Sequence, residues 1–186
     1  MRITETRLPG LFAIEPVVHG DARGFFLESY RQDVLASHGI THEWVQDNHS
    51  RSVRGVIRGM HFALPPGQAK LIRCVRGSIL DVCVDIRRGS PTFGQWDGVE
   101  LDDQAARMLY VPVGFAHGYC VTSDVADVVY KCSAYYDPQR EREINLEDPD
   151  LAIAWPDGPR ILSDRDRGAP RLAEVADSLP FVFVAA

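Results

Sequence analysis

The sequence has no long apolar run, no paired cysteine motif and no excess of positive charge. No stretch of the chain approaches the roughly 20 consecutive apolar residues that a membrane-spanning helix needs. The cysteines, at 74, 83, 120 and 132, are widely spaced without a Cys-x-x-Cys pair, so we expect buried, reduced thiols. The N-terminal segment MRITETRLPGLF carries charges throughout and lacks the apolar core of a signal peptide. Together these absences predict a cytoplasmic protein that does not act in a membrane.

The overall charge limits the possible partners. The formal net charge is −6, which disfavours non-specific binding to nucleic acid or to an anionic membrane surface. An anionic ligand must therefore be met by cations gathered at one place. The chain has 186 residues, 45% hydrophobic and 25% charged, a composition typical of a soluble globular protein. We expect a single domain over residues 1–186.

Short segments of strand-forming residues follow one another along most of the chain, separated by glycine and proline turns. Helical patterns are few: residues 29–39, with Ser29 as a possible cap and Gly39 as a stop, and a short segment after Pro170. The pattern predicts an all-β protein, a closed barrel or jelly roll with a few short helices. The expected strands are 11–18, 25–28, 56–58, 70–75, 79–86, 98–101, 108–113, 119–122 and 125–134.

The stretch 50–90 carries the strongest chemical signal. A single histidine, His61, lies among cationic residues, which an acidic protein has no general reason to concentrate there. We interpret this stretch as a site for an anionic small molecule, with His61 as a proton-transfer group. In the strand 79–86, Asp81 and Asp85 share one face, and the alternation alone leaves open whether that face meets solvent or a cavity. The cations near His61 are Arg54, Arg58, Lys70 and Arg73.

The motif PVGFAHG, residues 112–118, delivers His117 at the start of a strand. It resembles the second motif of the cupin superfamily, whose fold is a jelly-roll barrel. Metal-binding cupins add His-x-His and Glu in their first motif, where this chain has Arg58-Gly-Met-His61-Phe62 and then Lys70. A protonated lysine cannot ligate a metal, so we expect no metal site.

A more specific resemblance comes from a series of motifs in order along the chain. The series resembles the dTDP-4-dehydrorhamnose 3,5-epimerase family, metal-free cupins that act on dTDP sugars, over about residues 3–172. The motifs are GDARGFF, QDNHSRS, GVIRGMHF, KLIRCVRGSILDVCVDIRRGSPTFGQW, PVGFAHGY, VVYK, YYDP, EDPDLAIAWP and LSDRD.

The resemblance implies an enzyme without a cofactor that is a homodimer. Its substrate would be a 4-keto-6-deoxyhexose on thymidine diphosphate, a dTDP-sugar. The ketone at C4 makes the protons on C3 and C5 acidic, because loss of either gives an enolate. Epimerisation then needs a base on one face of the sugar, an acid on the other, and polar groups at the developing oxyanion.

The resemblance also assigns roles to individual residues. His61 would be the base, with Asp166 as its carboxylate partner, and Tyr130 would be the acid on the opposite face. Lys70 and His117 would bind around the sugar. Arg23 and Arg58 would meet the diphosphate, with Arg165 as a further candidate, since guanidinium groups match phosphate oxygens. The remaining implied contacts are Gln46, Asp47, Asn48, Glu28 and Glu141 to nucleotide and sugar, with Glu143 as an alternative to Glu141, and Tyr136 stacking on thymine.

Other interpretations remain open. Apart from the resemblance, His61 beside Phe62 and Tyr130 in an apolar strand are each more typical of core packing. Ala63 stands where the family usually has glutamine and Arg165 where it usually has lysine, so a relative that epimerises only C3 or only C5 is the main alternative. A nucleotide-sugar 3,4-ketoisomerase is disfavoured by the pairing of RGMH with VVYK. A metal-dependent cupin oxygenase and a non-catalytic sugar-nucleotide-binding cupin are the rivals from other classes.

Overall fold

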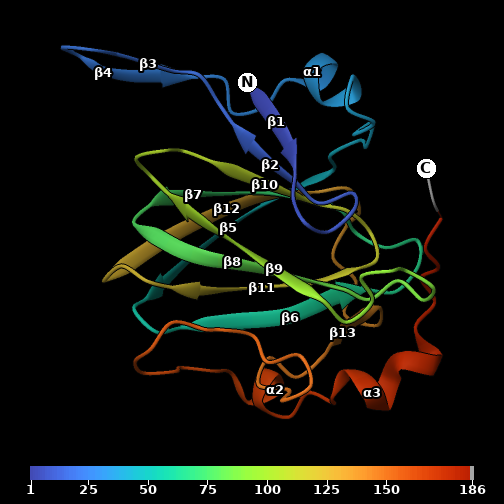
Figure 1. Cartoon of the computed structure of the whole chain (residues 1–186). Helices are drawn as coiled ribbons and strands as arrows, with labels where there is room; N and C mark the ends of the chain where they lie inside the picture. The colour runs from blue at the N-terminus through green and yellow to red at the C-terminus, as the bar shows by residue number, and fades with distance from the viewer. Residues whose placement is uncertain (185–186) are drawn as a thin grey trace.

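Two antiparallel sheets face each other and enclose the centre of the molecule (Figure 1). The computed structural model describes residues 1–184, so the last two residues of the expected domain lie outside the described part. The all-β class is confirmed. The six-stranded sheet has the order β1 (Arg2–Glu5), β2 (Phe12–Glu15), β10 (Met108–Val111), β7 (Lys70–Arg76), β12 (Val125–Cys132), β5 (Gln46–Val53). The five-stranded sheet has the order β13 (Glu141–Glu143), β6 (Ile57–Ala63), β11 (Phe115–Val121), β8 (Ser78–Asp85), β9 (Trp96–Asp102).

The space between the sheets is filled at one end by apolar side chains from alternate strand positions, including Ile72, Ile79 and Val128. Asp81 and Asp85 point into this interior and are completely buried. The sequence did not decide whether this face of the strand meets solvent or a cavity. In the structure it lines the inside of the barrel. The opposite face of β8 is also buried, because a third layer covers it.

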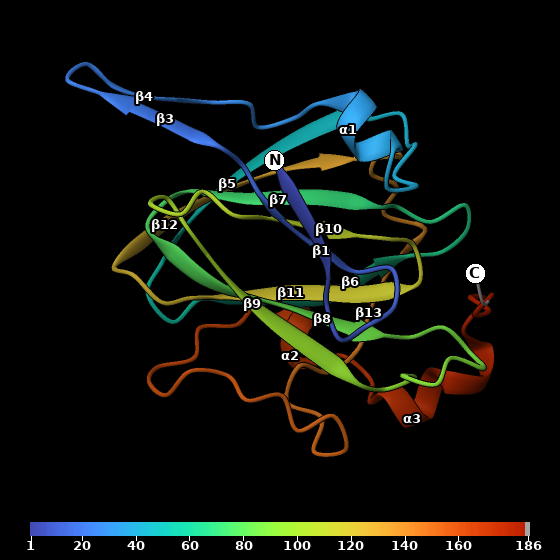
Figure 2. The same cartoon turned by 45° about the horizontal axis from the view of Figure 1, so that its top comes forward.

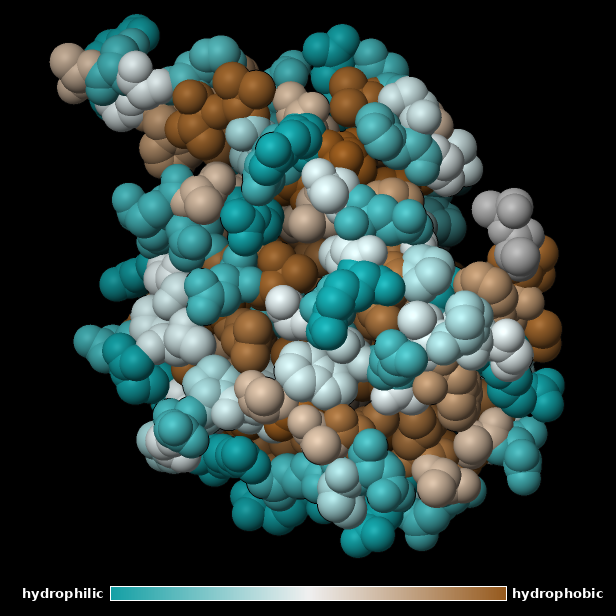
Figure 3. Space-filling view, in the orientation of Figure 1, coloured by the Kyte–Doolittle hydropathy of each residue, from teal (hydrophilic) through white to brown (hydrophobic). Residues whose placement is uncertain are grey.

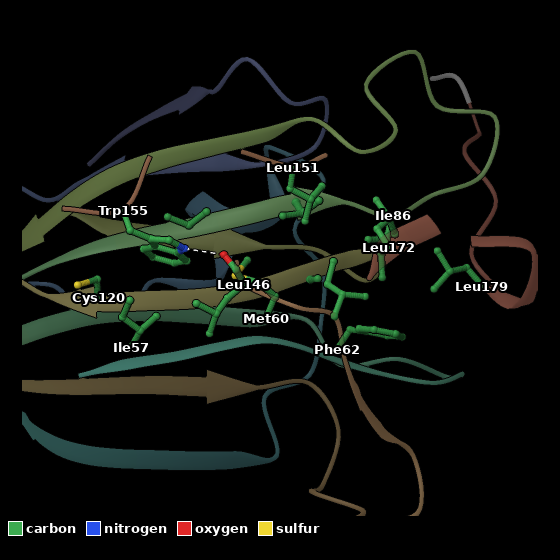
Figure 4. Packing of buried hydrophobic residues seen from close by; sticks show 14 of the residues in the cluster. Ile57, Met60, Phe62, Ile86, Cys120, Leu146, Leu151, Trp155, Leu172 and Leu179 are labelled. Atoms are coloured by element: carbon green, nitrogen blue, oxygen red, sulfur yellow. Dashed lines mark hydrogen bonds between the residues drawn. The ribbon is translucent and has the colours of Figure 1, made fainter. Parts of the chain in front are cut away.

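That third layer is the C-terminal segment, which packs under the five-stranded sheet (Figure 1). It contains α2 (Asp164–Arg167), α3 (Leu172–Val175) and a 3-10 turn at Ala176–Ser178. Figure 4 shows Trp155 in this layer, with its indole N–H donating to the carbonyl of Leu146 over 2.8 Å. The buried indole therefore has its hydrogen-bond partner, and the layer is held to the sheet by apolar contacts.

The helix α1 (Gln32–Ala36) packs on the outer face of the six-stranded sheet through Leu35. The expected helix over 29–39 is wrong at its start. Arg31, not Ser29, precedes the first turn, with an extended backbone (φ −148°, ψ 108°) and no side-chain cap. The helix ends before Gly39, whose φ of +78° is compatible with glycine and strained for other residues.

The strands β3 (Val18–Asp21) and β4 (Gly24–Leu27) form a hairpin that projects from the barrel (Figure 2). Residues 22 and 23 connect the two strands. Phe25 and Phe26 on β4 are 64% and 66% exposed. In the view of Figure 3 the hairpin stands clear of the main body, with an apolar patch at its base. No helix in residues 1–184 is long and apolar enough to cross a membrane.

Candidate active site

A cavity of about 190 Å³ opens into the barrel interior between the two sheets. Both sheets contribute to its wall: β5, β7 and β12 from one, β6 and β11 from the other. Five of the seven lining residues are among those predicted from the sequence. The lining residues are Ser50, Arg58, His61, Lys70, His117, Tyr119 and Tyr130.

A bulge in β6 turns both Arg58 and His61 toward this cavity. Side chains three positions apart on a regular strand point to opposite faces. Here His61 lies opposite His117 and Arg58 opposite Tyr119, so β6 uses one more residue than β11 over the same length. Gly59 has a φ of +144°, and a Cβ on it would lie 2.5 Å from the Cα of Gly118. Only glycine therefore permits β6 and β11 to approach this closely at the bulge.

His61 is paired with Asp166. Its Nε2 lies 2.6 Å from a carboxylate oxygen of Asp166, which is 4% exposed. Asp166 is held in α2, where Ser163 caps the helix by accepting from the Asp166 amide at 3.1 Å. Burial by itself would raise the pKa of Asp166, but the hydrogen bond and charge of His61 outweigh it and lower that pKa. Asp166 is therefore ionised, and it fixes the orientation of the imidazole.

Tyr130 lines the cavity from β12, in the sheet facing the one that carries His61. Burial raises the pKa of its phenol above the ordinary 10.0, with smaller contributions from neighbouring groups. The phenol is consequently protonated across the neutral range and can donate a proton. His61 and Tyr130 thus line one cavity from the two facing sheets.

Lys70, on β7, and His117, on β11, add a nitrogen group to the cavity lining from each of the two facing sheets. His117 is 8% exposed, and its Nε2 lies 2.8 Å and 3.0 Å from the two carboxylate oxygens of Asp81. Asp81 has no other hydrogen-bond partner among the described residues, so this buried carboxylate is matched to a single imidazole.

Gln46 and Asn48 lie on β5 beside the cavity and connect it to the Tyr136 loop. The Gln46 side-chain amide donates to Asn48 at 2.9 Å, and its oxygen accepts from the backbone amide of Tyr136 at 2.9 Å. The Tyr136 ring is 56% exposed and borders a second hollow of about 250 Å³. The loop thus presents an aromatic face near one end of the barrel.

Three predicted residues lie neither in the cavity lining nor at its edge within this chain. Asp47 alternates with Gln46 and Asn48, and its exposed carboxylate pairs with Lys131 at 3.0 Å. Arg23 is in the turn of the projecting hairpin, where it pairs with Asp21. Glu28 follows the hairpin, is exposed, and lies 3.7 Å from Arg31.

The last two predicted residues are Glu141, on the short strand β13, and Arg165, on α2. Glu141 is opposite Ala63 in β6, and Glu143 is opposite His61. Arg165, next to Asp166, donates to Glu143 with its Nε at 2.9 Å. Arg165 and Glu143 therefore form an ion pair at the edge of the site, and Glu141 is left without a salt bridge among the described residues.

Sequence reasoning missed two lining residues, Ser50 and Tyr119, and the pairing of His117 with Asp81. The alternation of β5 places Ser50 on the same face as Asn48, which is the one signal that pointed to it. Among residues 1–184, no group of three or more His, Cys, Asp or Glu side chains is arranged to hold a metal ion.

Comparisons with known proteins agree on one family. The family model described as dTDP-4-dehydrorhamnose 3,5-epimerase matches residues 5–174. The chain is 49% identical to dTDP-4-dehydrorhamnose 3,5-epimerase of Shigella flexneri over 168 residues, covering 89% of this chain and 93% of that protein.

Solved structures give the same result. A dTDP-6-deoxy-D-glucose-3,5-epimerase from Legionella pneumophila, crystallised with dTDP-4-keto-L-rhamnose, matches with a TM-score of 0.95 and 45% identity over 99% of both chains. A 4-keto-6-deoxy sugar epimerase from the novobiocin gene cluster of Streptomyces spheroides matches with a TM-score of 0.94 and 45% identity, over 97% of this chain and 93% of that one. The predicted cupin-type barrel is confirmed by these matches, and the chain belongs to the dTDP-4-dehydrorhamnose 3,5-epimerase family.

Proposed function

We propose that this protein epimerises a dTDP-4-keto-6-deoxyhexose at C3 and C5, converting the 4-dehydro-6-deoxyglucose derivative to the 4-dehydro-L-rhamnose derivative. The observation that carries the proposal is the position of His61 and Tyr130 on facing sheets of one cavity. Removal of a proton from one face and delivery of a proton to the other inverts the carbon between them.

His61 acts as the base in this proposal. Its Nε2 is engaged by Asp166 at 2.6 Å, which leaves Nδ1 as the nitrogen with a free lone pair. As His61 takes the proton from C3 or C5, the imidazole becomes positive, and the Asp166 carboxylate stabilises that charge. Tyr130 then donates its phenolic proton to the opposite face of the enolate.

The negative charge that develops on the C4 oxygen needs fixed positive or hydrogen-bonding partners. Lys70 and His117 line the same cavity and supply them. Both groups are in position before the substrate arrives, Lys70 on β7 and His117 through its bond to Asp81. Such preorganised groups stabilise the enolate more than mobile water does.

The nucleotide end of the substrate would extend toward the Tyr136 loop. Tyr136 offers an exposed ring for stacking on thymine, and Gln46 and Asn48 offer amide groups. Arg58 is exposed at the cavity wall, with its Nε donating to Ser52 at 3.1 Å, so its remaining donors are free for the diphosphate. We place Glu141 and Arg165 at the edge of the same substrate site.

We further propose that the protein is a homodimer in the cytoplasm. Phe25 and Phe26 are exposed on the hairpin, which is unusual for a lone chain in water. Arg23 and Glu28 are on or beside the same hairpin, away from their own cavity, so a second copy could receive them at its substrate site. The four free, buried cysteines suit a reducing compartment.

The test is incubation of the protein with dTDP-4-keto-6-deoxyglucose in D₂O, followed by NMR of the sugar protons. Deuterium at both C3 and C5, with an L-configured product, is the expected result. Deuterium at one carbon only would instead support a single-centre epimerase, the activity named for a similar solved structure, a 3'-monoepimerase from Streptomyces bikiniensis. Absence of exchange at both carbons would contradict either function.

A further inference from the structure

Two hydroxyl groups in the cavity wall have no part in the proton transfers described above. The hydroxyl of Tyr119, on β11, lies 2.9 Å from the Oγ of Ser50, on β5. The pair therefore joins the two sheets across the interior, and both residues line the cavity. Tyr119 is 4% exposed, so its hydroxyl is largely shielded from bulk water.

This hydroxyl pair has unused hydrogen-bonding capacity. Two hydroxyls carry two hydrogens, and their mutual bond uses one of them. Among the described residues, the other partner of the pair is the carbonyl of Val128, 3.5 Å from the Ser50 Oγ and therefore a weak acceptor. A buried hydroxyl with spare capacity facing a cavity is suited to a polar group on a ligand, because leaving it unpaired is unfavourable.

The position of the pair indicates which part of the substrate it meets. Tyr119 follows His117 by two residues on the same strand face, and the two ring centroids are 6.5 Å apart. Ser50 lies two residues from Asn48 along β5, on the side away from Gln46 and the Tyr136 loop. The pair is consequently near the reacting sugar and not near the nucleotide.

The chemistry of the sugar leaves one suitable group. C1 bears the diphosphate, C4 is the ketone faced by Lys70 and His117, and C5 carries a methyl group. The hydroxyl on C3 changes its direction when C3 is inverted, so a fixed donor cannot hold it before and after the reaction. The hydroxyl on C2 is the ring hydroxyl whose configuration the reaction leaves unchanged.

We propose that the Ser50–Tyr119 pair binds the C2 hydroxyl of the hexose and so selects sugars hydroxylated at C2 over 2-deoxy sugars. This inference rests on the proposed function and specifies its substrate class. A bond to C2 also keeps the ring in one position while C3 and C5 are inverted in turn. A site that pairs with a hydroxyl disfavours an analogue without it, because its own polar groups then stay unpaired.

The experiment measures kcat/KM for dTDP-4-keto-6-deoxyglucose and for its 2-deoxy analogue. We expect the wild type to prefer the hydroxylated sugar by about 10- to 100-fold. Tyr119→Phe removes only the hydroxyl; it should lower kcat/KM for the hydroxylated sugar by roughly 10-fold and leave the two sugars nearly equal. Ser50→Ala should reduce the preference in the same direction, and it covers the case in which Tyr119→Phe fails to fold.

Tyr110→Phe is the matched control. Tyr110 is also buried and its hydroxyl also has one side-chain partner, His42 at 2.9 Å, but it packs on the outer face of the six-stranded sheet. This variant should keep the full preference for the hydroxylated sugar. If the Ser50–Tyr119 hydrogen bond only connected the two sheets, Tyr119→Phe would lower the stability of the protein without changing its preference for the hydroxylated sugar.

The outcomes separate this inference from the proposed function. A wild type that epimerises both sugars equally well, or a Tyr119→Phe variant that keeps the full preference, would overturn the role of the pair while leaving the epimerase intact. A wild type that exchanges no proton on either sugar would overturn both.

Discussion

The barrel and the β3–β4 hairpin differ in how their charged groups are placed: buried and paired with histidine at the cavity of the barrel, exposed on the hairpin. At the cavity, Asp81 in the barrel and Asp166 in α2 are almost fully buried, and each is bound to a lining histidine at hydrogen-bond distance. On the hairpin, Arg23 is exposed beside two exposed phenylalanines and pairs only with its neighbour Asp21. The difference indicates that one chain positions the proposed proton-transfer groups, whereas the role proposed for the hairpin depends on a second copy.

Loss of the base should have the largest effect. Because the proposal gives the proton removal to His61 alone, His61→Ala should lower kcat by about 10⁴-fold or more. Binding of dTDP, measured by calorimetry, should change little, because the proposed nucleotide contacts lie elsewhere. Retention of most of the turnover would exclude His61 as the base.

Removal of the buried carboxylate should have a smaller effect. Asp166→Asn keeps the size of the side chain but removes the charge that stabilises the protonated His61, and the expected loss in kcat is about 10²- to 10³-fold. KM should change little. Asp164→Asn, an exposed change two residues away in the same short helix, is the control and should leave kcat unchanged.

Disruption of the hairpin should affect assembly first and substrate binding second. Phe25→Ser combined with Phe26→Ser removes the exposed aromatic surface, and light scattering should then show a monomer. If Arg23 of a second copy meets the substrate, KM should rise by roughly 10-fold in the same variant, with a smaller change in kcat. Val182→Ser, at an exposed apolar residue away from the hairpin, is the control. A double variant that remains dimeric would contradict the role given to the hairpin.

The smallest effect concerns the ionisation of Tyr130. Burial disfavours the phenolate, so the pKa of Tyr130 is raised, and its phenol should still be protonated when pH passes the ordinary value of 10.0. The difference in phenolate absorbance between wild type and Tyr130→Phe, followed during an alkaline titration, should rise only above that pH. A midpoint at or below 10.0 would show that the interior is wetter around Tyr130 than the structure indicates.

The sequence predicted the barrel interior better than the hairpin because strand alternation is a local signal. It predicted the all-β class and the strands that carry Lys70 and Tyr130, but it ended the strand expected over 56–58 before His61, which lies in β6 (Ile57–Ala63). It could not decide the environment of Asp81 and Asp85, since nothing local to β8 shows that a C-terminal layer covers the other face of that strand.

Long-range pairings were the main limit. Ser50 and Tyr119 are 69 residues apart, and only the register of two sheets brings their hydroxyls together. Asp47 illustrates the opposite case: a period of two along β5 already places it on the face away from Asn48, and the structure has it there. The helix expected over 29–39 followed local spacing, whereas packing of Leu35 and Ile40 on the sheet decided its real extent.

The most direct test of the account is the behaviour of Tyr130→Phe in D₂O. With His61 and Asp166 intact and the phenol absent, dTDP-4-keto-6-deoxyglucose should still exchange protons with solvent from the side of His61, while inversion falls by about 10²-fold or more. The matched Tyr110→Phe variant should invert normally. Inversion by Tyr130→Phe at the wild-type rate would contradict the claim that the two facing sheets deliver the base and the acid to opposite faces of the sugar.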